Sequence, residues 1–61
     1  MRIGVSMRIE FRKGSHKQIH IQVFYGDSID EAHKRATEFV ERVENKGWVL
    51  VYSEVISIKE V

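Results

Sequence analysis

Apolar and polar residues alternate with a period of two over the first 25 positions, a pattern typical of strands that bury one face. In residues 1–12 the odd positions are apolar, from Met1 to Phe11. In residues 16–25 four apolar residues from Ile19 to Tyr25 again fall on odd positions, whereas Phe24 stands on an even one. Gly14 lies in the polar break between the two segments. The pattern predicts a hairpin with strands over about 1–12 and about 16–25.

The pairing of these two strands follows from which residues are apolar. Directly opposed residues share a face of a sheet, so we expect odd positions to lie opposite odd positions. Placing Phe11 opposite Ile19 and Arg12 opposite Gln18 satisfies this condition. The prediction leaves a loop of three or five residues around Gly14.

A helix is predicted over about residues 28–46. Ser28 and Glu31 have the spacing of a capping box, and Gly47 can adopt the left-handed conformation that ends a helix. Acidic residues stand four positions before basic ones along the opposite side, which indicates a solvated face. The apolar residues recur at three- and four-residue steps and predict one buried stripe: Ile29, Ala32, Ala36, Phe39, Val40 and Val43.

Residues 48–59 form a third predicted strand, and both of its faces are apolar. Trp48, Leu50 and Tyr52 occupy one parity, whereas Val49 and Val51 occupy the other. A bulge near residues 53 and 54 would switch the parity partway along the strand.

The order strand, strand, helix, strand predicts an α+β fold of ββαβ type in a single domain, residues 1–61. The helix packs on one face of a three-stranded sheet and returns the third strand parallel to the second. The strand order can be 2-1-3 or 1-2-3. We favour 2-1-3, in which every neighbouring pair is antiparallel, and in both orders the third strand lies at an edge.

An edge strand that is apolar on both faces invites pairing with another chain. A domain of 61 residues without cysteine has a thin stability margin, and oligomerisation is a common remedy. We therefore expect a homodimer that acts as an accessory or inhibitory protein-interaction module through its sheet face or edge strand. The expected partner or dimer interface comprises Phe24, Trp48, Val49, Leu50, Val51, Tyr52 and Val55.

The predicted topology also gathers basic residues at the hairpin tip, beside the end of the helix. A nucleic-acid-binding module is therefore the alternative function, with cations meeting phosphates and Trp48 stacking on a base. Its contacts would be Arg12, Lys13, His16, Lys17, Arg42 and Lys46. A net charge of +1 supplies little non-specific affinity, so we favour the protein-binding function.

The residue types and spacings predict no enzyme activity, metal site, cofactor or small-molecule substrate. No nucleophile motif or phosphate-binding glycine loop is present. Three histidines are the only side chains that could supply nitrogen ligands to a zinc ion. No apolar run has the length of a membrane span or the apolar core of a signal peptide. We expect a cytoplasmic protein without membrane association.

The segment Gly26-Asp27-Ser28-Ile29-Asp30-Glu31-Ala32 resembles the start of the helix in HicB-type antitoxins, which also follows a hairpin. The resemblance covers about seven residues. The first two strands depart from that family, because they lack its acidic-glycine hairpin and its proline-containing segment. No family is assigned from this segment.

Overall fold

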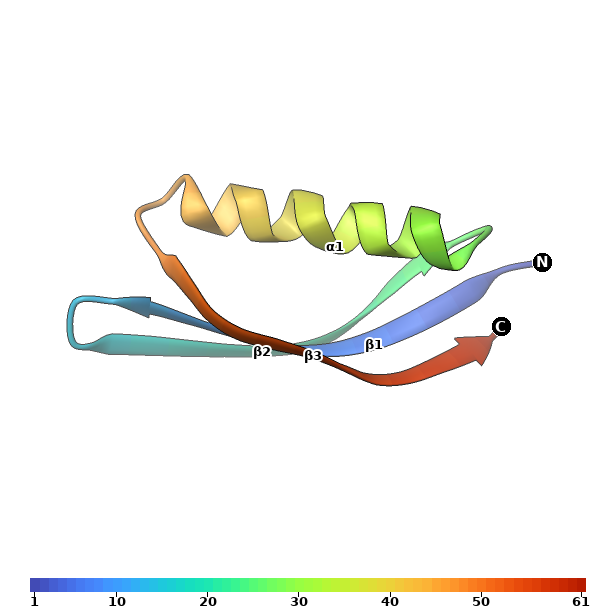
Figure 1. The fold of residues 1–61 in the computed structure, drawn as a ribbon, viewed down its shortest axis with the longest axis horizontal. Coiled ribbons are helices and arrows are strands. Elements are labelled where there is room, and N and C mark those ends of the chain that lie inside the picture. Colours follow the sequence, from blue (N-terminus) through green and yellow to red (C-terminus); the bar gives the residue numbers. More distant parts are fainter.

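A computed structural model describes all 61 residues, which form a three-stranded sheet and one helix. The elements are β1 (Ile3–Lys13), β2 (His16–Gly26), α1 (Ile29–Glu44) and β3 (Val49–Glu60). The strand order is β2-β1-β3, and β1 is antiparallel to both neighbours. The helix lies along one face of the sheet (Figure 1). The ββαβ fold, the 2-1-3 order and the edge position of the third strand are therefore confirmed.

Helix α1 begins at the capping box. The Glu31 amide donates to Ser28 Oγ at 3.1 Å, and the Glu31 carboxylate accepts from the Asp27 amide at 3.4 Å. Gly47, with φ of 93°, follows the last turn and has the left-handed conformation that was expected there. The helix is not long and apolar enough to cross a membrane.

The core lies between α1 and the two strands β1 and β2. The Phe39 ring packs edge-on against Phe11 and His20, with ring centroids 6.3 and 5.2 Å away, and lies 5.7 Å from Phe24. Ile29 is 50% exposed, so its assignment to the buried helical stripe was wrong. The buried hydrophobic residues are Val5, Met7, Ile9, Phe11, Phe24, Ala32 and Ala36.

The predicted hairpin register was wrong by one residue. Phe11 lies opposite Gln18 and Arg12 opposite Lys17, because the turn contains only two residues, Gly14 and Ser15. Gly14 has φ of 60°, the backbone conformation that a type II′ turn requires at its first central position. Odd positions of β1 therefore share a face with even positions of β2.

This register places the two apolar patterns on opposite faces of the sheet. The odd positions of β1 face α1 together with Phe24, which is only 7% exposed. Phe24 is thus a core residue, and its assignment to a partner interface was wrong. The apolar residues of β2 occupy the face that α1 does not cover, where they remain exposed: Ile19, Ile21, Val23 and Tyr25.

Strand β3 contains two bulges, where a single one was expected near residues 53 and 54. Val51 has no partner on β1 between the pairs Phe11–Leu50 and Glu10–Tyr52. Ile56 has none between the pairs Met7–Val55 and Ser6–Ser57. Each bulge shifts the parity by one, so the residues of β3 on the helix side of the sheet are Leu50, Ser53, Val55, Ile58 and Glu60.

The turn predicts a specific sensitivity of stability to one substitution. Gly14→Ala should lower the free energy of unfolding by about 1–2 kcal/mol, because a Cβ disfavours the left-handed conformation. Ser15→Ala is the matched control and should change stability by less than about 0.5 kcal/mol. Chemical denaturation followed by circular dichroism measures both. Equal effects at the two positions would contradict the assigned turn.

Candidate protein-binding site

Strand β3 is exposed on both faces. Helix α1 packs over β1 and β2 and leaves β3 uncovered, so Val55 and Ile58 on the helix side are 51% and 50% exposed. On the opposite face Val49 is 64% exposed. Only Ser57 among the twelve residues of β3 is not exposed. Because β3 pairs only with β1, its outer backbone N–H and C=O groups have no strand partner.

A groove separates α1 from β3 on the helix side. Its volume is about 220 Å³, and its apolar lining comes from three elements. Met7 and Ile9 of β1 form part of the lining, with Ala36 and Val40 on the helix and Leu50 on β3. The groove thus joins the exposed helix-side residues of β3 to the edge of the core.

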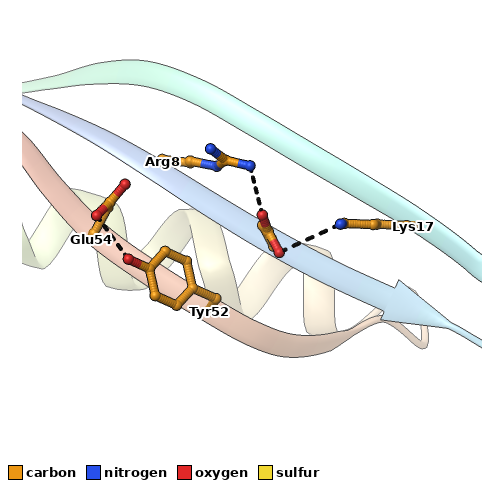
Figure 2. A network of polar contacts seen from close by, with 5 residues as sticks. Arg8, Lys17, Tyr52 and Glu54 are labelled. Atoms are coloured by element: carbon orange, nitrogen blue, oxygen red, sulfur yellow. Dashed lines mark hydrogen bonds and ion pairs between the residues drawn. The ribbon is translucent and has the colours of Figure 1, made fainter.

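The face of the sheet that α1 does not cover combines a row of polar contacts with an apolar column. The column consists of the exposed residues of β2: Ile19, Ile21, Val23 and Tyr25. Figure 2 shows Arg8 and Lys17 on either side of a carboxylate that belongs to Glu10. Arg8 Nη2 lies 2.9 Å from Glu10 Oε1, and Lys17 Nζ lies 3.9 Å from Glu10 Oε2. The Arg8 Nε atom is buried and has no hydrogen-bond partner. The apolar column of β2 borders this network.

Tyr52 and Glu54 also lie on the uncovered face, on β3 (Figure 2). The Tyr52 hydroxyl donates a 2.7 Å hydrogen bond to Glu54 Oε2. This bond, the cost of desolvation and the negative charge of Glu54 raise the pKa of Tyr52 above its ordinary value. The hydroxyl therefore stays protonated to higher pH than an ordinary tyrosine and can keep its hydrogen bond to the Glu54 carboxylate.

The predicted interface residues have different environments in the structure. Trp48 is half-buried and packs against the core, and Phe24 is buried, as described above. The remaining residues are exposed on β3: Val49, Leu50, Val51, Tyr52 and Val55. The sequence-based set omitted Ile56 and Ile58, which are equally exposed, although their apolar character and their position on the third strand could have identified them.

The structure places the basic residues of the alternative site at one end of the molecule. The β1–β2 turn and the C-terminal end of α1 lie at the same end in Figure 1. The Lys13 ammonium donates to the Lys46 carbonyl at 2.8 Å and lies 5.9 Å from the Trp48 ring centroid. Lys13 thus ties the hairpin to the end of the helix.

The other basic side chains differ in their surroundings. Arg12 stands beside Lys17 in the hairpin, and Lys17 lies near Glu10. His16 is opposite Lys13 at the turn, and all of the basic residues at this end are exposed. These residues share one end, but a nearby carboxylate partly balances the charge of Lys17.

A second hollow, of about 530 Å³, lies at the opposite end, near the start of α1. The cations that line it already have partners. Arg2 lies over the Tyr25 ring at 4.6 Å, and Arg35 pairs with Glu31 at 3.5 Å.

No group of three or more His, Cys, Asp or Glu side chains is placed to hold a metal ion. Comparison with known proteins found no matching family, no similar curated protein and no similar solved structure.

The position of Lys13 predicts a structural role. Lys13→Met should lower the free energy of unfolding by about 1 kcal/mol, because it removes the hydrogen bond to the Lys46 carbonyl. Trp48 fluorescence should also change, since the ammonium near its ring is lost. Lys34→Met, on the exposed side of the helix, is the control and should have neither effect. Unchanged stability and fluorescence in Lys13→Met would exclude this role.

Proposed function

We propose that this protein is a small non-enzymatic binding protein that forms a homodimer through β3. The observation that carries the proposal is the exposure of β3 on both faces and along its outer edge. Seven of its twelve residues are large hydrophobic side chains that remain exposed. Natural proteins usually shorten, charge or cover such an edge, and pairing with a second chain covers it completely.

The small core supports the same proposal. Seven hydrophobic residues are buried, and all of them lie on β1, β2 or α1. A domain of this size buries only about 60% of the surface that its unfolded chain exposes, so it gains much from further burial. Each Å² of apolar surface removed from water contributes about 25 cal/mol. A dimer through β3 would extend the core across the groove beside α1.

In such a dimer the uncovered sheet face would remain free, and we propose it as the surface that receives another protein. Its apolar column on β2 and Tyr52 on β3 include the aromatic residues that are enriched at interfaces. Arg8 and Glu10 on the central strand β1 lie between this column and Tyr52, where their charges would make polar contacts inside the interface. An accessory or inhibitory module that occupies a partner's surface fits these features.

Self-association gives the first test. The wild-type protein should sediment as a dimer at micromolar concentration. Val55→Lys should raise the dissociation constant by on the order of a hundredfold, because the dimer would bury an unpaired charge. The exposure of Val55 in the single chain should leave the fold intact, as circular dichroism would report.

Ile21→Lys is the matched control for this test, because Ile21 is exposed on β2, away from β3. It should leave the dimer unchanged. A wild-type protein that sediments as a monomer at these concentrations would exclude the homodimer.

The alternative is binding of nucleic acid at the basic end of the molecule. If the protein-binding function is correct, labelled single-stranded DNA should show no saturable, salt-dependent binding in fluorescence anisotropy near physiological salt. Affinity that falls steeply with salt and is lost in Arg12→Glu/Lys17→Glu would instead support nucleic-acid binding. These two positions are preferable to Lys13, whose substitution would also disturb the fold. Arg35→Glu at the other end is the control.

A further inference from the structure

The two bulges give β3 a face pattern that is symmetric about Glu54. On the helix side, Ser53 and Val55 stand one position before and after Glu54. Leu50 and Ile58 stand four positions before and after it. Without the bulges at residues 51 and 56, successive side chains of β3 would point to the two faces of the sheet in strict alternation. The pattern would then be symmetric about any residue. With them, only Glu54 is a centre of symmetry for these four residues.

This symmetry matters for pairing between identical strands. Two antiparallel copies of one edge strand in a continuous sheet are related by a two-fold axis perpendicular to the sheet. The axis places one residue opposite the same residue of the second copy. Directly opposed residues share a face of the sheet. The order of helix-side and outer-side residues must therefore be the same in both directions from the central residue. At Glu54 the condition holds for every mirrored pair of β3 residues in which both have a partner on β1.

We propose that β3 pairs antiparallel with β3 of a second copy, with Glu54 opposite Glu54, to form a continuous six-stranded sheet. The inference rests on the proposed homodimer and specifies its register. Leu50 then lies opposite Ile58 and Ser53 opposite Val55, each pair occurring twice. Both helices lie on one face of the sheet, and the apolar residues of the two β3 strands form a shared floor between them.

The charges at the centre of this arrangement sum to zero. Arg8 lies opposite Glu54 in the β1–β3 register of each copy. The central row therefore contains two arginines flanking two glutamates. Opposed like charges disfavour pairing, and Arg8, which is ion-paired with Glu10 at 2.9 Å, offsets only part of the repulsion. A net charge of +1 per chain adds little repulsion between copies.

Strand β3 also offers enough surface for a specific dimer. An interface at the low end of the usual range buries about 600 Å² on each partner. This is roughly a seventh of the 4411 Å² that one chain exposes. Strand β3 contributes twelve of the 61 residues, nearly all exposed, and its outer edge is available for contact along this whole length.

Disulfide trapping tests the register, because the chain has no cysteine of its own. In the proposed dimer, Glu54→Cys places two thiols directly opposite each other, with Cα atoms about 4.5–5.5 Å apart, within the range of a disulfide. Mild oxidation should convert most of this variant to a covalent dimer on a non-reducing gel. Ser57→Cys is the matched control, because its two copies would lie about 20 Å apart along the strands and should not cross-link.

The outcomes separate the register from the homodimer itself. Rapid cross-linking of Glu54→Cys alone supports the register. A wild-type dimer in which Glu54→Cys does not cross-link, or in which Ser57→Cys does so equally well, overturns the register and leaves the homodimer standing. A monomeric wild-type protein overturns both.

A second variant tests the register without relying on cysteine chemistry. Glu54→Gln removes the opposed charges, and its side-chain oxygen can still accept the Tyr52 hydrogen bond. The dimer dissociation constant should fall at least threefold, as measured by sedimentation equilibrium. Glu60→Gln, which lies away from the axis, should change it much less. A weakened or unchanged dimer in Glu54→Gln would overturn the self-opposed position of Glu54.

Discussion

The width of the single helix limits how much of the three-stranded sheet can be covered. An α-helix with its side chains is about 10–12 Å across, whereas neighbouring strands are about 4.8 Å apart. One helix therefore covers about two strands. In this chain α1 covers β1 and β2, and Phe39 contacts the rings of Phe11, His20 and Phe24. The third strand completes the sheet but receives no cover.

The length of the helix has a similar effect at the hairpin. The 16 residues of α1 extend about 24 Å, whereas the 11 residues of each hairpin strand extend about 36 Å. The hairpin therefore continues beyond the end of the helix (Figure 1). Lys13 connects the two where they meet, which assigns a structural role to a residue that composition alone would place on a binding surface.

Strand β3 holds more exposed large hydrophobic residues than any other element, because α1 packs over β1 and β2. Strand β3 combines a free backbone edge with apolar side chains on both faces, and the groove beside α1 adds part of the core boundary to the same region. Association through this strand would pair the free edge and bring the helix-side apolar residues of two copies together, whereas Val49 and Tyr52 would stay on the uncovered sheet face. The uncovered sheet face, in which β2 supplies the apolar residues and β1 the charges, would remain available for a different partner.

The elements and their order could be predicted from the sequence, because they depend on local signals. The Ser28–Glu31 capping box predicted the helix, period-two alternation predicted the first two strands, and an apolar segment predicted the third. Chain connectivity then restricted the sheet to two orders. Tertiary structure decided which residues share a face. The two-residue turn at Gly14 shifted the hairpin by one position and moved Phe24 into the core, and two bulges altered the faces of β3. Alternation cannot reveal these shifts, since a slip of one residue reverses every side chain and only packing against α1 selects between the two faces.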